Sequence, residues 1–294
     1  MATYILFNPH AQNGKGEAGA KALGAKLAGE ELIFCDMTTL ASYTEFFAGL
    51  ADTDKVILCG GDGTINRFAS EAEPSVLERE LYYYPTGTGN DFWNDLGKSA
   101  EDDPILLNPY LKNLPRVTIN GKESLFLNAI GYGIDGYCCE VGDELRRTSD
   151  KPINYAGIAI KGVLGKFKQR KATVTVDGVT HEFKRAWLAP VMHGRYYGGG
   201  MIMAPDQVRN NEDGTLSLVL FHGCGKLKTL MIFPSVFKGE HIKYKKNITV
   251  LTGKEFEVSF DRPTPLQIDG ETVLGVESYS AVSGAVVKET AKVN

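Results

Sequence analysis

The sequence lacks three features that would point away from an ordinary cytoplasmic enzyme. It contains no apolar run near the roughly 20 residues that a membrane-spanning helix needs. Met1–Phe7 leads directly into a strand-like run, so we expect no signal peptide. The formal net charge is −4, whereas nucleic-acid-binding proteins usually carry a basic surface. We therefore expect a cytoplasmic protein without a nucleic-acid partner.

Cysteine is also scarce. The five cysteines are odd in number and lack the spacing of metal ligands. Cys35 and Cys59 lie in apolar runs, where buried reduced thiols are usual. With 294 residues, 43% of them hydrophobic and 23% charged, the chain is a typical globular protein of about two domains.

The N-terminal third alternates predicted strands and helices. Such alternation predicts βαβ units and a parallel sheet, with ligands bound at the carboxyl ends of the strands. The predicted strands are Tyr4–Phe7, Leu32–Cys35, Lys55–Cys59 and Leu81–Tyr84. The predicted helices are Glu17–Leu27, Tyr43–Leu50 and one that begins at Ile65.

After Glu101–Asp103 the pattern becomes that of an antiparallel β-sandwich, with helical insertions near 136–145 and 153–167. Asn120-Gly121 and Asp177-Gly178 suit two-residue hairpin turns. The hairpin strands and further strand candidates are Val117–Ile119, Ser124–Ile130, Ala172–Val176, Val179–Phe183, Trp187–Met192, Leu216–Leu220, Ile248–Leu251, Phe256–Phe260 and Leu266–Ile268. We place the first domain at 1–117, with 280–294 as a candidate to complete it, and the second at 118–279.

The most informative stretch is Gly60-Gly61-Asp62-Gly63-Thr64, between a buried strand and a helix. Its glycines permit positive φ and close backbone approach, and amides at a helix start favour phosphate. Asp62 would repel phosphate unless a cation lies between them, which suggests Mg²⁺. The alternative is a tight turn in which Asp62 caps the helix.

Three more polar stretches follow predicted strands. Pro85–Phe92 suits a loop around a nucleotide, or a glycine turn in which Asn90 or Asp91 caps a helix. Asn8–Gly16 could cradle phosphate with Lys15, or form a plain loop. Gln267–Glu271 enters an Asp-Gly turn, which by itself predicts a hairpin.

Together these stretches resemble the soluble diacylglycerol kinase catalytic family, in its bacterial lipid-kinase branch. That superfamily also includes sphingosine kinases and NAD kinases. Gly60–Thr64 matches its nucleotide signature, and Gly87-Thr88-Gly89-Asn90-Asp91-Phe92 matches a more specific second one. Asn128–Asp135 resembles the strand and turn that open the family's C-terminal domain. Ala204-Pro205 with Asp213-Gly214 resembles a segment that holds a structural Mg²⁺, and Asp269–Glu271 matches the catalytic-base motif.

The resemblance implies a Rossmann-like, NAD-kinase-type parallel-sheet domain, a lipid-binding antiparallel β-sandwich domain, and an active site in the cleft between them. It implies ATP-dependent phosphorylation of a lipid hydroxyl, with diacylglycerol converted to phosphatidic acid. Glu271 would be the base and Asp62 would hold Mg²⁺. ATP would bind at Asn8, Thr38, Gly60, Gly61, Asp62, Gly63, Thr64, Ile65, Asn66 and Thr88. A structural Mg²⁺ would bind the Asp213 carboxylate and the carbonyls of Asn210 and Thr215.

Two positions depart from the family pattern. Relatives often carry Ser-Gly in the first loop, where this chain has Ala11–Gly14, and many have an acidic residue in place of Arg67. Alternative functions are a kinase for a sphingoid lipid, another lipid or NAD, and a nucleotide-binding protein without catalysis. Pairing of exposed strand edges would give a homodimer.

A lipid substrate requires contact with a membrane, which we expect to be peripheral, at the inner face. One basic group follows a helix that bears Ile158, Val163, Leu164 and Phe167, and it comprises Lys161, Lys166, Lys168, Arg170 and Lys171. A second comprises Lys238, Lys243, Lys245 and Lys246. Basic residues beside apolar ones dock on anionic lipid. The alternative is a solvated charged face on a core helix.

Overall fold

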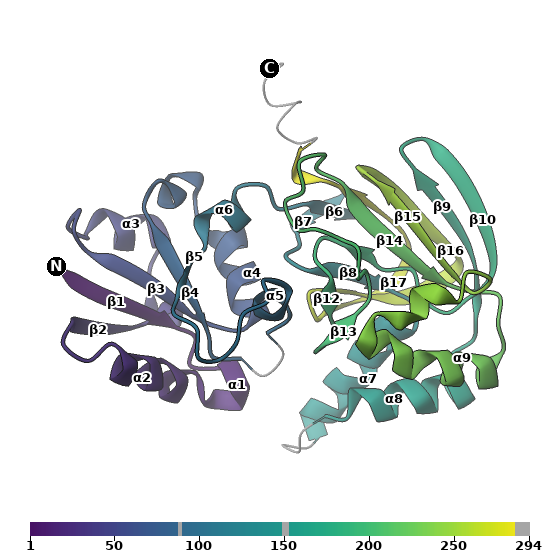
Figure 1. Ribbon diagram of the computed structural model, residues 1–294, viewed down its shortest axis with the longest axis horizontal. Coiled ribbons are helices and arrows are strands. Elements are labelled where there is room, and N and C mark those ends of the chain that lie inside the picture. The colour runs from purple at the N-terminus through teal and green to yellow at the C-terminus, as the bar shows by residue number, and fades with distance from the viewer. Residues whose placement is uncertain (88–89, 149–152, 286–294) are drawn as a thin grey trace. The chain divides into compact units, whose positions relative to one another are not determined.

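The chain divides between Leu114 and Pro115 into two compact units, which are described separately below (Figure 1). This computed structural model describes residues 1–87, 90–148 and 153–285. The division separates the strand–helix alternation from the β-rich part of the sequence. Residues 116 and 117, which we expected in the first domain, pair with the last strand of unit 2. Residues 280–282 belong to that last strand as well.

Unit 1 is built on a five-stranded sheet in the order β2-β1-β3-β4-β5. β1 to β4 are parallel, and only the short β5 runs antiparallel to its neighbour. The strands are β1 (Ala2–Phe7), β2 (Glu31–Asp36), β3 (Lys55–Gly60), β4 (Leu81–Pro85) and β5 (Ile105–Leu106). This is the parallel sheet predicted from the strand–helix alternation.

Helices connect these strands. They are α1 (Ala11–Gly14), α2 (Gly16–Lys26), α3 (Tyr43–Ala48), α4 (Asp62–Glu71), α5 (Asp91–Asp95) and α6 (Asn108–Leu111), with 3₁₀ turns η1 (Met37–Thr39) and η2 (Pro74–Glu78). Ala20 and Leu23 on α2 pack against Ile5 and Ile57 of the sheet. Burial of apolar surface stabilises the fold by about 25 cal/mol per Å². Burial of this helix face therefore holds the loops at the strand ends in place.

Unit 2 contains a ten-stranded antiparallel sheet. Along its main path the order is β15-β14-β11-β8-β16-β17-β6-β7, and β9 pairs with β10 and with β16. The strands are β6 (Arg116–Ile119), β7 (Lys122–Leu125), β8 (Ala129–Tyr132), β9 (Arg170–Val176), β10 (Val179–Ala186), β11 (Val191–Met192), β14 (Leu216–Phe221), β15 (Ile248–Gly253), β16 (Glu255–Ile268) and β17 (Glu271–Val282). A separate pair joins β12 (Tyr196–Tyr197) to β13 (Met201–Ile202).

β16 connects the two layers of unit 2. Its first part, Phe256–Phe260, pairs with β9, whereas Leu266–Ile268 pairs with β8. The register with β17 shifts between Ser259 and Leu266. A strand that bends in this way passes from one layer to the other, which gives the sandwich-like fold that the sequence predicts.

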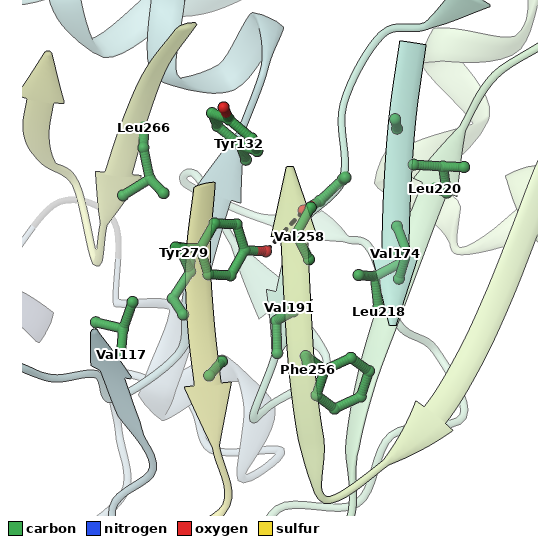
Figure 2. Close-up of a cluster of buried hydrophobic side chains, with 14 of the residues drawn as sticks. Val117, Tyr132, Val174, Val191, Leu218, Leu220, Phe256, Val258, Leu266 and Tyr279 are labelled. Carbon is green, nitrogen blue, oxygen red and sulfur yellow. Dashed lines mark hydrogen bonds between the residues drawn. The ribbon is translucent and has the colours of Figure 1, made fainter. Parts of the chain in front are cut away.

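Apolar side chains from several strands fill the interior of this sandwich. Figure 2 shows Val191, Phe256 and Val258 around Tyr279, whose hydroxyl donates to the Ala189 carbonyl at 3.1 Å. Tyr132 is fully buried, and its hydroxyl donates to the Val276 carbonyl at 2.7 Å. Each buried phenol therefore has the hydrogen-bond partner that its burial requires.

Helices cover one part of unit 2, where α8 and α9 lie side by side (Figure 1). They are α7 (Ile134–Thr148), α8 (Tyr155–Lys161), the π-helical turn η3 (Gly162–Lys166), α9 (Lys226–Ile232) and the 3₁₀ turns η4 (Phe233–Lys238) and η5 (Glu240–Lys243). Val163, Phe167 and Ile232 pack with Trp187 and Phe221 of the sheet. Among the described residues, no helix has the length and apolar character needed to cross a membrane.

Both predicted hairpins are confirmed. Asn120 and Gly121 have φ of 51° and 75°, and Asp177 and Gly178 have 48° and 82°. These are the left-handed conformations of a type I′ turn. The first hairpin is shorter than expected, because Ser124–Ile130 divides into the end of β7 and the start of β8.

Some local expectations are wrong. The first loop contains the helical turn α1, and α4 begins at Asp62 rather than Ile65. The two late strand candidates, Phe256–Phe260 and Leu266–Ile268, are one continuous strand, β16. β17 is the second strand of the hairpin that the Asp269-Gly270 turn predicts, but its extent to Val282 was not predicted, because polar residues interrupt its alternation.

Candidate active site

The glycine loop between β3 and α4 is packed against neighbouring backbone. A carbon added at Gly60 would lie 2.3 Å from the Thr64 hydroxyl oxygen. One added at Gly87 would lie 2.7 Å from the Cα of Gly61. Gly61 has φ of −105°, and neither Gly60 nor Gly87 is among the described residues with positive φ. The expectation of left-handed backbone here is wrong. Close approach of two loops explains Gly61 and Gly87, whereas Gly60 is packed against the Thr64 side chain that follows it.

The sheet register aligns the ends of three parallel strands. Phe7 at the end of β1 is opposite Cys59, and Gly60 at the end of β3 is opposite Pro85. The Thr86 amide donates to the Gly60 carbonyl at 2.8 Å. The loops that begin at Asn8, Gly61 and Thr86 therefore start side by side at one edge of the sheet, as parallel strands require.

Asp62 connects two of these loops. Its carboxylate accepts hydrogen bonds from the backbone amides of Asp91, at 2.8 Å, and Phe92, at 3.2 Å. Both amides belong to the first turn of α5, where helix N–H groups have no partner within the helix. Asp62 thus caps a helix, as the alternative interpretation of its motif predicts. The capped helix is α5, however, and not α4, which begins at Asp62 itself.

Two buried oxygens near this edge have no hydrogen-bond partner among the described residues. They are the hydroxyl oxygen of Thr86 and the amide oxygen Oδ1 of Asn90. The Asn90 amide nitrogen donates to the Gly87 carbonyl at 2.8 Å, which fixes the orientation of the side chain. Buried polar atoms without partners are costly, so they indicate a ligand or water. Thr86 and Asn90 were not among the predicted ATP-binding residues, although both lie in the second motif.

The other predicted ATP-binding residues differ from one another in burial and in hydrogen bonding. Asn8 accepts a hydrogen bond from the His10 amide at 3.0 Å, and Thr38 donates to Asp36 at 2.7 Å. Ile65 is fully buried, so only its backbone could face a ligand. Asn66 accepts from the Ser70 hydroxyl at 3.3 Å. Thr88 lies outside the described residues.

Glu271, the predicted base, is the first residue of β17 and is exposed. It is opposite Ile268 across a two-residue turn formed by Asp269 and Gly270, with φ of 46° and 97°. The next residue, Thr272, donates to the Asp143 carboxylate of α7 at 2.7 Å. The hairpin therefore holds the backbone of Glu271 while its side chain faces solvent.

Asp269 fixes this turn to the segment before β8. Its carboxylate accepts hydrogen bonds from the amides of Leu127, Asn128 and Ala129, at 2.5, 2.7 and 3.1 Å. Gln267 adds a further tie, because its side-chain oxygen accepts from the Gly270 amide at 2.6 Å. The three amides therefore hold the Asp269 side chain in place against the segment before β8.

Asp135 is an acidic residue of unit 2 that the sequence did not single out. It accepts hydrogen bonds from the Gly136 amide at 3.0 Å and from the Tyr197 hydroxyl at 3.3 Å. Burial raises its pKa to about 6, and these hydrogen bonds only partly oppose the rise. A partly buried carboxylate with a raised pKa is a candidate site residue. Its only sequence signal is its place at the end of the Asn128–Asp135 motif.

The segment of the predicted structural Mg²⁺ is closed by Asn211. The Asn211 side chain accepts from the Thr215 amide at 2.9 Å and donates to the Thr215 carbonyl at 2.8 Å. Gln207 donates to the same carbonyl at 3.0 Å. Both lone pairs of the Thr215 carbonyl oxygen therefore accept hydrogen bonds. As arranged here, Thr215 does not fit a metal ligand, while Asp213 is exposed. The ion at Asn210, Asp213 and Thr215 stays a prediction.

Asp62 fits Mg²⁺ in a different way. Its carboxylate supplies oxygen ligands of the kind that Mg²⁺ binds, and it accepts hydrogen bonds from two amides. In nucleotide sites Mg²⁺ usually binds one or two carboxylates, the phosphates and several waters. Within the described part of the chain, no group of three or more His, Cys, Asp or Glu side chains forms a metal site. Asp62 therefore fits one ligand of a magnesium ion that a nucleotide brings with it.

The two units match two family descriptions in order. Residues 2–115 match "Diacylglycerol kinase catalytic domain", and residues 128–287, more than half of the chain, match "YegS C-terminal NAD kinase beta sandwich-like domain". The chain belongs to the diacylglycerol kinase/YegS family of lipid kinases. Its members are ATP-using kinases.

Individual relatives are distant. Diacylglycerol kinase of Mycobacterium tuberculosis H37Rv is 26% identical over 65% of this chain, and the match spans 62% of that protein, less than two thirds of its length. Diacylglycerol kinase of Bacillus subtilis 168 is 26% identical over 76% of this chain and 73% of its own length. A crystal structure of a diacylglycerol kinase from Bacillus anthracis Sterne covers 96% of this chain and 94% of its own, with a TM-score of 0.55 and 20% identity. That last likeness concerns the fold alone.

Proposed function

We propose that this lipid kinase transfers the γ-phosphate of ATP to the free hydroxyl of diacylglycerol and so forms phosphatidic acid. The observation that carries the proposal is the link from Asp62 to the amides of Asp91 and Phe92, which joins the two glycine motifs at one sheet edge. The relatives named diacylglycerol kinase support the choice of acceptor.

Unit 1 contributes the nucleotide site. The amides at the start of α4 and the backbone of the 86–87 turn bind phosphate oxygens, since helix starts favour negative charge. The Thr86 and Asn90 oxygens without partners accept from the nucleotide or its bound water. Mg²⁺, held in part by Asp62, would supply charge neutralisation on the phosphates.

Unit 2 contributes the proton acceptor in this proposal. Glu271 takes the proton of the lipid hydroxyl as that oxygen attacks the γ-phosphorus, a role worth about 10²–10⁴ in rate. Asp269 and Gln267 fix the turn that carries it, as their hydrogen bonds to Leu127 and Gly270 support. Phosphoryl transfer asks a protein mainly for positioning and charge stabilisation, so a fixed turn is well suited to it.

An acceptor panel tests the proposal. The whole protein is incubated with Mg²⁺ and ATP labelled at the γ-phosphate, and with dispersed short-chain diacylglycerol, sphingosine or NAD in separate reactions. We expect label in phosphatidic acid, and much less in the other two products. Label in sphingosine phosphate or NADP alone would overturn the choice of diacylglycerol. Label in no product, with ATP bound, would support a nucleotide-binding protein without catalysis.

A further inference from the structure

Unit 2 contains a second site that none of the predicted catalytic or nucleotide-binding residues line. It is a cavity of about 610 Å³ between the start of β9, the end of β10 and the start of α9. Phe167 and Trp187, both buried, contribute apolar surface. We call it the basic pocket, after the six cations that line it, Lys168, Arg170, Lys171, Lys184, Arg185 and Lys226.

The positive charge of the basic pocket is poorly compensated. Among the described residues that line it, Asp261 is the only acid, and its side chain lies 3.8 Å from Arg262. Across the described residues, the salt bridges include none of the six cations. Burial lowers the pKa of Arg170 and the nearby Arg262 lowers it further, whereas Asp261 and Tyr132 oppose the shift. The protein has a net charge of −4, so this local concentration of positive charge favours binding of an anion.

The backbone is shaped to present these side chains. Arg185 has φ of 58°, which is rare for a long side chain, and it lies where the register of β10 with β9 shifts after Phe183. Its Nε donates to the Gln169 side-chain oxygen at 3.1 Å. Arg170 is fixed as well, because it donates to the Thr264 hydroxyl at 2.9 Å. Strain of this kind persists where the surroundings hold it, and it concentrates at functional sites.

Exposed apolar side chains border the basic pocket. Leu227 and Met231 on α9 are 81% and 73% exposed, and Leu164 on η3 is 52% exposed. Lys226 connects these elements by donating to the Leu164 carbonyl at 2.6 Å. Large apolar side chains beside lysines and arginines are the composition of surfaces that lie in the lipid headgroup region. A soluble anion would need the cations but not these apolar neighbours.

We propose that the basic pocket binds the phosphate headgroup of an anionic phospholipid, while Leu164, Leu227 and Met231 enter the adjoining bilayer surface. The cations neutralise the phosphate, and the apolar side chains leave water for the acyl boundary. This site would hold the protein on the membrane whatever the acceptor of the kinase reaction is. Its failure and the failure of the proposed function are therefore separable.

Vesicle binding tests the proposal. The whole protein, without ATP, is mixed with vesicles of phosphatidylcholine alone or of phosphatidylcholine with phosphatidylglycerol, and the bound fraction is measured by flotation. We expect binding only to the anionic vesicles. The pocket variant Lys168→Ala/Lys171→Ala/Lys184→Ala should lose about a hundredfold in binding, because each lysine near an anionic surface contributes about fivefold. These three side chains are exposed, so folding should be unchanged in thermal melts.

The matched control removes the same charge from the second basic group, as Lys238→Ala/Lys245→Ala/Lys246→Ala. It should lose no more than about fivefold, since these lysines do not line the pocket. The variant Leu227→Ser/Met231→Ser should also weaken binding to anionic vesicles. Equal losses in the pocket and control variants would overturn the proposal, because general charge would then explain binding. If Leu227→Ser/Met231→Ser binds anionic vesicles as well as the wild type does, these side chains do not insert into the bilayer.

A soluble anion is the remaining occupant to test. Titration calorimetry with inorganic phosphate is run on the wild type and on the pocket variant. Tight binding of phosphate that the pocket variant loses, together with vesicle binding that it keeps, would assign the pocket to a soluble anion and contradict the proposal. Activity on dispersed short-chain substrate is measured in parallel and should be the same in the wild type and the pocket variant.

Discussion

The carboxylate of Asp62 lies 2.8 Å from the backbone amide of Asp91 and accepts a hydrogen bond from it. Asp62 belongs to the first glycine motif and Asp91 to the second, so a single carboxylate joins the two signatures of the family. The motifs thus act as one structural element, in which the aspartate positions a helix start. Loss of Asp62 should therefore affect stability as well as chemistry.

Asp62→Asn should lower the free energy of unfolding by about 1–3 kcal/mol, even without Mg²⁺. An amide keeps one acceptor but loses the charge that strengthens hydrogen bonds to the amides of Asp91 and Phe92. Urea denaturation measures the change, with the exposed Asp52→Asn as control. If Asp62→Asn is as stable as the wild type in the absence of Mg²⁺ and nucleotide, the carboxylate does not hold the two motifs together.

Much of the fold could be predicted from residue patterns. Apolar β-branched runs such as Lys55–Cys59 marked the parallel strands, because strands buried on both faces need apolar residues throughout. Asn120-Gly121 and Asp177-Gly178 marked both hairpins, since few other residues adopt positive φ easily. The signatures also identified the family, because their order along the chain is hard to produce by chance.

What the sequence could not predict depends on contacts between distant residues. Asp62 and Asp91 are 29 positions apart, and no local pattern shows that one accepts from the other. The same is true of Asp269 and Leu127, which are 142 positions apart. The extent of β17 was missed because sheet pairing, rather than alternation, holds its polar positions in place. The raised pKa of Asp135 follows from burial, which becomes visible only in three dimensions.

Asn211→Ala should lower the melting temperature more than Asp213→Ala does. Asn211 bonds both the amide and the carbonyl of partly buried Thr215, and each lost hydrogen bond costs about 0.5–1.5 kcal/mol. Differential scanning calorimetry with and without a chelator provides the measurement. A melting temperature that falls on chelation in the wild type, but not in Asp213→Ala, would instead support the predicted structural Mg²⁺.

Asp135 should make stability depend on pH. Its pKa rises from 3.8 in the unfolded chain to about 6 in the fold, so between these values the folded state binds more protons. Stability therefore falls as pH rises from about 4 to 6, and up to about 3 kcal/mol stays lost above that range.

Asp135→Asn, which is neutral at every pH, should be more stable than the wild type near neutral pH and lose this advantage below about pH 4. Urea denaturation across this range gives the comparison, with exposed Asp206→Asn as the control. An advantage that is the same at all pH values would mean that the Asp135 carboxyl titrates normally.

The central claim is that this protein phosphorylates a lipid hydroxyl with Glu271 as base, and steady-state kinetics with ATP and short-chain diacylglycerol test it most directly. We predict formation of phosphatidic acid by the wild type, and a fall in kcat of about a hundredfold or more in Glu271→Gln, with the KM for ATP nearly unchanged. Gln keeps the shape of the exposed side chain at the start of β17 and removes only the proton acceptor. A variant that keeps the wild-type kcat while the KM for ATP rises steeply would contradict the account.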